Sequence, residues 1–161
     1  MQAKDIYTKL KAKFDNKVLD LVEQPQFEPF INVEPTAIKE ISMFLRDEAG
    51  LEFDYMANLT GMDNKDSLGI VYHLYSMQYK HRIVLKVKLN REKPAVPTVE
   101  RVWKTANWHE REVYDMFGVE FENHPDLERI LCPEDWEGFP LRKDYTAPKE
   151  YHGIDATPNN P

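Results

Sequence analysis

The stretch Asn107-Trp-His-Glu-Arg-Glu-Val-Tyr-Asp-Met-Phe-Gly118 predicts an amphipathic helix of about three turns. We expect Asn107 to cap its first turn, and Glu110 to complete a capping box by accepting the Asn107 backbone N–H. Gly118 stands where a helix commonly ends in a residue with positive φ. Winding the stretch at about 100° per residue gives an apolar stripe that includes Glu110, and a polar stripe made of Arg111, Asp115, Trp108 and Glu112.

The residues before this helix predict a single α+β domain over 1–121. Apolar residues at helical spacing predict a helix over residues 1–15, and Glu34-Pro35 opens a second one that Gly50 ends. Alternating or continuous apolar runs predict strands at Val18–Val22, Phe27–Val33, Phe53–Thr60, Gly69–Met77 and His81–Leu89.

The last of these strands alternates between apolar and cationic residues, which is typical of a sheet with one buried and one wet face. We therefore expect a mostly antiparallel sheet of four to five strands with helices packed on one face. A short helix capped by Thr98 is expected to lead into the helix at Asn107.

Composition excludes several classes of protein. The chain has 161 residues, enough for one domain with a substantial core, and its net charge of −7 argues against a nucleic-acid binder. Cys132 is the only cysteine, so the chain can form no internal disulfide and cannot supply the four thiolates of an iron–sulfur cluster. The apolar runs are far shorter than the ~20 residues of a spanning helix, so any membrane association is expected through partners.

Residues 122–161 predict an extended, proline-rich C-terminal tail. Prolines recur too often for a long helix, yet the segment carries large apolar residues that need burial, among them Ile130, Leu131, Trp136, Phe139 and Leu141. Extended chain of this kind cannot build its own core. It must lie on its own domain or on another subunit, and we favour the second.

The sequence lacks most of the residue patterns that are typical of catalytic sites. His109-Glu110 begins like a zinc-protease helix, but Val113 occupies the position of the second histidine ligand. Glu110 and Glu112 point about 160° apart on a helix, so they cannot share one substrate. Arg111 and Asp115 are spaced for an i,i+4 ion pair. A stand-alone hydrolase that uses Glu110 and His109 remains an alternative of another class.

The segment Pro140-Leu-Arg-Lys-Asp-Tyr145 leaves two interpretations open. It is either a solvated turn or a basic knuckle that docks on a partner's carboxylates. Its position alone does not choose between them.

Together these segments resemble a known family. Asn107-Trp-x-Glu-Arg-Glu-x-x-Asp-Met-Phe-Gly118, His124-Pro125, Arg129-Ile130-Leu131 and Gly138-x-Pro140-Leu-Arg-Lys-Asp-Tyr145 resemble the 30-kDa subunit family of respiratory complex I, known in bacteria as the C subunit of NADH-quinone oxidoreductase. The resemblance is strong over roughly residues 98–147 and weaker over the sheet region. Glu128 departs from the pattern, since relatives often carry a basic residue or proline there.

The resemblance implies a non-catalytic assembly subunit in the hydrophilic arm of a proton-translocating NADH:quinone oxidoreductase. Its implied partners are the quinone-site large subunit and the terminal-cluster subunit, with FMN, iron–sulfur clusters and quinone held by the complex and none by this chain. The implied location is peripheral, on the cytoplasmic face of the bacterial inner membrane. The ending Thr157-Pro-Asn-Asn-Pro161 resembles the form that is not fused to the quinone-site subunit. An equivalent subunit of a membrane-bound hydrogenase or a ferredoxin-linked complex is the alternative within this class.

We expect the residues that dock on partners to come from this helix and the tail. The helix contributes its charged residues, and the tail contributes cations, carboxylates and aromatic anchors. The expected set is Glu110, Arg111, Glu112, Asp115, His124, Arg129, Trp136, Phe139, Arg142, Lys143, Asp144 and Tyr145.

Overall fold

The computed structural model describes residues 1–155, so the final residues of the expected tail, including Thr157–Pro161, lie outside the described residues. The N-terminal half comprises α1 (Ala3–Phe14), η1 (Asp15–Lys17), β1 (Val18–Val22), β2 (Phe30–Val33), η2 (Pro35–Ala37) and α2 (Ile38–Asp47). The remainder comprises β3 (Tyr55–Asp63), β4 (Ser67–Tyr75), β5 (Arg82–Asn90), β6 (Ala95–Pro97), α3 (Ala106–Phe117), β7 (Glu120–Glu122), β8 (Glu150–Tyr151) and β9 (Ile154–Asp155).

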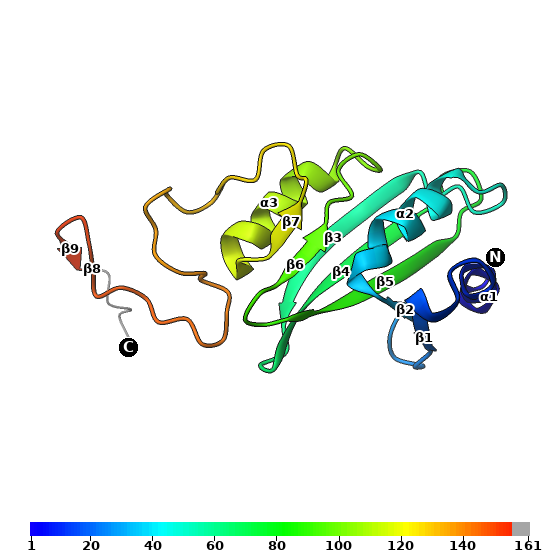
Figure 1. Ribbon diagram of the computed structural model, residues 1–161, viewed down its shortest axis with the longest axis horizontal. Coiled ribbons are helices and arrows are strands. Elements are labelled where there is room, and N and C mark those ends of the chain that lie inside the picture. The colour runs from blue at the N-terminus through cyan, green and yellow to red at the C-terminus, as the bar shows by residue number, and fades with distance from the viewer. Residues whose placement is uncertain (156–161) are drawn as a thin grey trace.

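The main sheet has five strands in the order β1-β2-β5-β4-β3 (Figure 1). Strands β3, β4 and β5 form an antiparallel meander, and β1 pairs antiparallel with β2. Strand β2 pairs parallel with β5, so the sheet is mixed, with three of its four strand pairings antiparallel. The alternation of residues within a strand shows which face is buried, but it does not show whether the neighbouring strand runs parallel or antiparallel. Parallel neighbours are joined by a long crossover connection, so their pairing cannot be read from adjacent residues.

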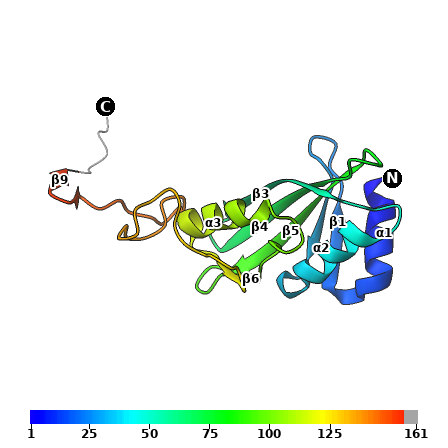
Figure 2. The same cartoon turned by 90° about the horizontal axis from the view of Figure 1, so that it is seen from above.

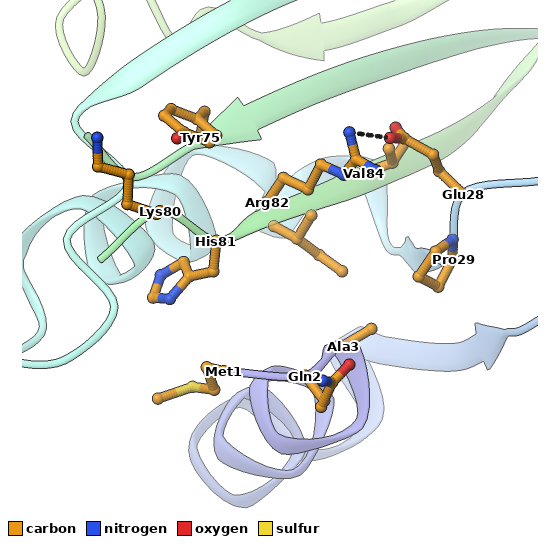
Figure 3. Close-up of a pocket in the computed structure, with 11 residues that line it drawn as sticks. Met1, Gln2, Ala3, Glu28, Pro29, Tyr75, Lys80, His81, Arg82 and Val84 are labelled. Atoms are coloured by element: carbon orange, nitrogen blue, oxygen red, sulfur yellow. Dashed lines mark ion pairs between the residues drawn. The ribbon is translucent and has the colours of Figure 1, made fainter. Parts of the chain in front are cut away.

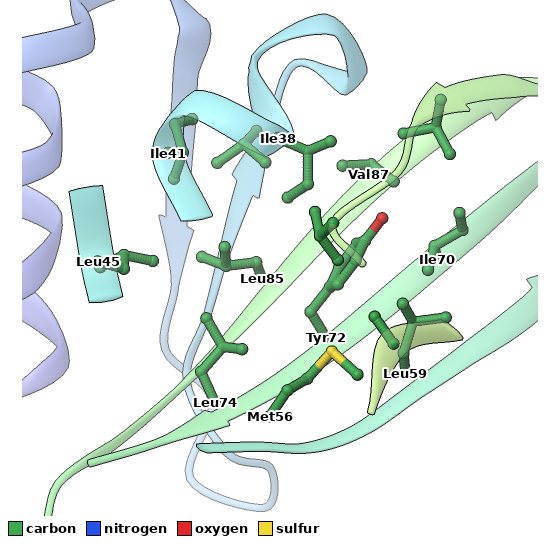
Figure 4. Close-up of a cluster of buried hydrophobic side chains, with 14 of the residues drawn as sticks. Ile38, Ile41, Leu45, Met56, Leu59, Ile70, Tyr72, Leu74, Leu85 and Val87 are labelled. Carbon is green, nitrogen blue, oxygen red and sulfur yellow. The ribbon is translucent and has the colours of Figure 1, made fainter. Parts of the chain in front are cut away.

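The core lies between one face of this sheet and the helices. Seen from above, α1 and α2 lie at one end of the sheet and α3 at the other (Figure 2). Figure 4 shows Ile41 and Leu45 of α2 on one side of Leu85, with Tyr72 and Met56 of the sheet on its other side. All of these side chains are at most 1% exposed. The alternation predicted for β5 is confirmed, because Ile83, Leu85, Val87 and Leu89 all join the core.

Two local predictions near α3 are wrong. The helix begins at Ala106, so Asn107 lies inside it, and its N-cap Thr105 makes no side-chain capping bond. The segment after Thr98 is a turn closed by N–H groups of Val102 and Trp103 on the Val99 carbonyl, and it is not a helix. The C-terminal prediction is confirmed, since Gly118 adopts φ +69° and its N–H bonds to the Tyr114 carbonyl.

The segment after β7 has no helix among the described residues. β7 pairs parallel with β6, and irregular chain then leads to the short β8–β9 hairpin. In Figure 1 this segment runs away from the end of α3, on the side opposite α1. Irregular chain of this length is held in place by side chains, and those side chains form the site described next.

Candidate functional site

Asp115 is the centre of the first anchor of the tail. Its side chain is fully buried, and its Oδ2 accepts the backbone N–H groups of Ile130 (3.0 Å), Leu131 (2.7 Å) and Cys132 (2.9 Å). Its Oδ1 accepts the Arg129 guanidinium at 2.7 Å. Burial by itself would raise the pKa of this carboxyl, but the three backbone donors and Arg129 outweigh it and lower the pKa below its usual value.

The i,i+4 pair expected between Arg111 and Asp115 does not form. Arg111 instead lies 3.3 Å from the Asp126 carboxylate and donates to the Glu128 carbonyl at 3.2 Å. The helical wheel placed Asp115 on the wet stripe because it counts only the helix itself. The tail covers only part of that stripe, at Arg111 and Asp115, and both residues therefore bind the tail.

Arg129 extends the anchor along the tail. Besides Asp115, its guanidinium donates to the carbonyls of Trp136 and Gly138, each at 3.0 Å. A guanidinium has several donors in a fixed plane, so one side chain can join three segments of irregular backbone. Without regular secondary structure these carbonyls would otherwise depend on water.

A second anchor forms where α3 ends. A Cβ on Gly118 would overlap the Phe139 ring, so glycine permits both the positive φ and the close approach of this ring. The Arg142 Nε donates to the Phe117 carbonyl at 2.6 Å, and its guanidinium carbon lies 4.8 Å from the centre of the Phe139 ring. The Leu141 N–H donates to the Met116 carbonyl at 3.1 Å. The tail thereby bonds to the last carbonyls of the helix.

A third anchor joins the tail to the sheet. Asp63 in β3 accepts Arg91 Nη1 at 2.6 Å and the Lys143 backbone N–H at 2.8 Å, while Arg91 also binds Asp144 at 2.6 Å. The Arg91 guanidinium holds the pKa of the Asp63 carboxyl well below its usual range, and hydrogen bonds to both carboxylates raise the pKa of Arg91. Sequence reasoning missed Asp63 and Arg91, because no local pattern connects residues so far apart in the chain.

Glu110 occupies a different environment on the same helix. It is fully buried, its Oε2 accepts the Thr98 hydroxyl at 2.5 Å, and its Oε1 accepts the Val99 N–H at 2.8 Å. The expected capping box is absent because the carboxylate turns to the loop after β6. Burial raises the pKa of Glu110 to about 7, although the bonds from Thr98 and Val99 oppose this rise.

His124 covers Glu110 at the beginning of the tail. Its side chain has no exposed surface, and its Nε2 lies 3.8 Å from Glu110 Oε2. The same nitrogen contacts the Asn107 carbonyl at 3.2 Å, and Nδ1 accepts the Asp126 backbone N–H at 3.0 Å. Glu110 therefore faces Thr98, Val99 and His124, so the structure does not assemble the Glu110–His109 pair of the hydrolase alternative.

Large apolar side chains near these anchors remain exposed. Trp108 on α3 is 63% exposed, and in the tail Leu131 and Leu141 are 63% and 54% exposed. Glu112 and Lys143 are also exposed. Trp136 and Tyr145 are half-buried, and each has a buried side-chain polar atom with no hydrogen-bond partner among the described residues.

A hollow of about 590 Å³ lies elsewhere, between the start of the chain and the β4–β5 turn (Figure 3). Arg82 and Glu28 form an ion pair of 2.9 Å across one side of it, and the buried His81 bonds to the Leu51 carbonyl at 2.8 Å. None of the residues expected to dock on partners lines this hollow.

Among residues 1–155, no helix is long and apolar enough to cross a bilayer. The same residues contain no cluster of three or more histidine, cysteine, aspartate or glutamate side chains able to hold a metal ion.

Comparisons with known proteins agree with the motifs of α3 and the tail. The family described as respiratory-chain NADH dehydrogenase, 30 Kd subunit, matches residues 31–151. The C subunit of NADH-quinone oxidoreductase from Chlorobium phaeobacteroides is 48% identical over 157 residues, which are 95% of this chain and 94% of the relative. Its counterpart in Chloroherpeton thalassium is 48% identical over 151 residues, which are 92% of this chain but only 62% of that relative.

Two solved structures are similar to this chain. A trypsin-resistant fragment (1-134) of Nqo5 has a TM-score of 0.64 and 27% identity, covering 79% of this chain and all of the fragment. A chain of the membrane-bound sulfane sulfur reductase, an archaeal respiratory membrane complex, has a TM-score of 0.73 over 91% of this chain and 86% of that one. At 23% identity this second likeness concerns the fold alone. By its motifs, its fold and its relatives, this chain belongs to the respiratory-chain NADH dehydrogenase 30 Kd subunit family.

Proposed function

We propose that this chain is a structural and assembly subunit of a proton-translocating NADH:quinone oxidoreductase. Its role is to present a pre-formed docking surface to neighbouring subunits, while electron transfer from NADH to quinone takes place on those subunits. Membership of the family and the names of its relatives support the type of complex.

The observation that carries this proposal is a fixed backbone with exposed apolar side chains. The Leu131 N–H is bonded to Asp115 and the Leu141 N–H to Met116, yet both leucine side chains are largely exposed to solvent. A rigid apolar anchor loses little conformational entropy on binding, so it suits a protein–protein interface. We define the docking surface as Leu131, Leu141 and Trp108, with Glu112 and Lys143 as charged neighbours.

The other residues expected at partners support this surface from inside the chain. Glu110, Asp115, Arg129, Arg142 and Asp144 all bind residues of this chain. We assign them to holding the tail in shape, together with Arg111, His124, Trp136, Phe139 and Tyr145. We propose that these residues contact partners only through the parts of their side chains that are exposed.

The proposed partners are the quinone-site large subunit and the terminal-cluster subunit of the complex. FMN, the iron–sulfur clusters and quinone are assigned to the rest of the complex, because one cysteine, Cys132, does not fit the four thiolates of a cluster. We assign the chain to the cytoplasmic face of the inner membrane, where the complex holds it.

The name of the similar Nqo5 fragment supports different roles for the domain and the tail, with the domain stable by itself and the tail in contact with partners. That fragment is described as trypsin-resistant, and it covers 79% of this chain. We infer that residues 1–121 form the stable domain and that residues 122–161 are the segment that contacts the partners.

The test replaces both exposed leucines, in the variant Leu131→Asp/Leu141→Asp. We expect the isolated chain to melt as the wild type does, while the assembled complex is lost on native gels. Leu19→Asp is the matched control, since Leu19 is 45% exposed but lies on β1. Full assembly with the double variant would contradict the proposal.

Arg142→Glu is less suitable as a test of docking. It removes the bond to the Phe117 carbonyl and places a carboxylate beside Asp144, so its effect would mix folding with assembly. Identification of the subunits that co-purify with the wild-type chain decides between NADH:quinone oxidoreductase and the hydrogenase or ferredoxin-linked alternative.

A further inference from the structure

Glu110 is a buried carboxylate without a cationic side chain in hydrogen-bond contact among the described residues. Its two oxygens accept a hydroxyl and a backbone N–H, those of Thr98 and Val99. Burying an ionised carboxylate without a close cation is unfavourable, and protonation removes that cost. The folded chain therefore favours the protonated form of Glu110.

The groups packed around Glu110 do not compensate its charge. From β4 comes the fully buried Tyr72, and burial first and the Glu110 carboxylate second raise the pKa of its hydroxyl. From the turn after β6, the Glu100 carboxylate adds a repulsive negative charge, although Glu100 itself is paired with Lys104. From the tail comes His124, and along α3 the nearby Arg111 is directed to Asp126.

His124 contacts backbone groups through both of its ring nitrogens. Its Nδ1 accepts the Asp126 N–H, so that nitrogen carries no hydrogen, and its Nε2 faces the Asn107 carbonyl as a donor. Protonation at Nδ1 would break the bond to Asp126. Both ring nitrogens of His124 are thus engaged by other groups, and the ring lies beside Glu110 Oε2 at 3.8 Å.

We propose that Glu110 is a proton-binding site inside the folded chain, and that its charge state controls how firmly His124 holds the root of the tail on α3. We define the root as His124 and Asp126. When Glu110 loses its proton, the carboxylate is stabilised by water, and displacement of the His124 ring is the movement that admits water. This inference concerns the isolated chain and does not rest on the proposed function.

The direction follows from linkage between protonation and opening. Burial in the folded chain raises the pKa of Glu110 from 4.5 to about 7, and deprotonation favours opening by the share of this rise that closure of the root supplies. The root is held most firmly below pH 4.5 and loosens progressively as the pH rises from 4.5 to about 7. The rise in pKa limits the loosening to roughly 300-fold.

The test measures hydrogen exchange of the Asp126 amide in the isolated chain from pH 6 to 8.5. Exchange is expressed as a protection factor, which removes the intrinsic dependence of the exchange rate on pH. We expect protection to fall by up to about tenfold in the wild type and to stay constant in Glu110→Gln. The control Glu112→Gln changes an exposed glutamate of the same helix and should behave as the wild type.

Isotope-edited infrared spectroscopy of the wild-type carboxyl groups keeps the proposal testable if Glu110→Gln does not fold. A protonated buried carboxyl should be present at pH 6 and disappear with a midpoint near 7. Thr98→Val removes a hydrogen bond to the ionised form and should move this midpoint upward. Constant Asp126 protection in the wild type, or a Glu110 already ionised at pH 6, would overturn the proposal.

Discussion

Glu110 and Asp115 lie on the same helix, and both are fully buried, yet their protonation behaviour is opposite. Asp115 receives three backbone N–H groups and a guanidinium, whereas Glu110 receives one N–H and one hydroxyl. Burial raises the pKa of a carboxyl in both places, and the number and charge of the donors decide whether it ends above or below its usual value. Because of this difference in donors, Asp115 stays ionised and holds the tail at neutral pH, whereas Glu110 can change its charge near pH 7.

The largest effect is expected from Asp115→Ala. This variant leaves Arg129 and three backbone N–H groups without their acceptor, and we expect it to reduce the free energy of unfolding by about 3–5 kcal/mol. Urea denaturation measures the change, with Glu112→Ala as an exposed control on the same helix. A loss no greater than that of the control would show that the anchor carries little stability.

The pH dependence of the Asp115 anchor has a definite sign. Because the folded chain lowers the pKa of Asp115, its stabilisation is complete above the ordinary value of 3.8 and is lost as the pH falls through the lower folded value. Denaturation curves of wild type and Asp115→Asn should therefore converge only in strong acid.

Glu110→Gln should have the opposite pH dependence. The raised pKa means that the wild type is destabilised progressively as the pH rises from 4.5 to about 7, by roughly 3 kcal/mol at most. The variant lacks this change, so its stability relative to the wild type should be higher at pH 8 than at pH 5. Parallel stability profiles for the two proteins would contradict the contrast with Asp115.

Gly118→Ala tests how closely the tail approaches the end of α3. The added Cβ meets the Phe139 ring and a positive φ disfavours alanine, so we expect a loss of about 1–3 kcal/mol in thermal unfolding. Gly153→Ala is a matched control, since Gly153 has φ +79° but nothing within 4 Å of the new Cβ. Equal losses in the two variants would mean that backbone strain alone is responsible.

Asp126→Asn should have the smallest effect. Asp126 is 54% exposed and pairs with Arg111 at 3.3 Å, and such pairs contribute about 0–1 kcal/mol. The loss should shrink further in high salt, whereas that of Asp115→Ala should not. A large, salt-independent loss would place Asp126 with the buried anchors.

Prediction from sequence succeeded where the signal is local. The residues of α1, α2 and β1 are close to the predicted segments, and Gly118 ends α3 as expected. Prediction from sequence failed where a side chain binds a distant segment and not its own helix. Glu110 was expected to cap its own helix and instead binds Thr98 and Val99, and Asp115 was expected on a wet face that the tail covers.

The sequence by itself determined the approximate positions of α1, α2, α3 and the five strands of the main sheet, the apolar face of β5 and the family motifs, because all of these depend on spacing between near neighbours. The tertiary structure decided the parallel pairing of β2 with β5, the binding of Asp63 to Arg91 and Lys143, and the opposite environments of Glu110 and Asp115. The strand pairing depends on contacts between distant segments, and the environment of each carboxylate depends on the number of donors that the fold brings to it. No local pattern records that number.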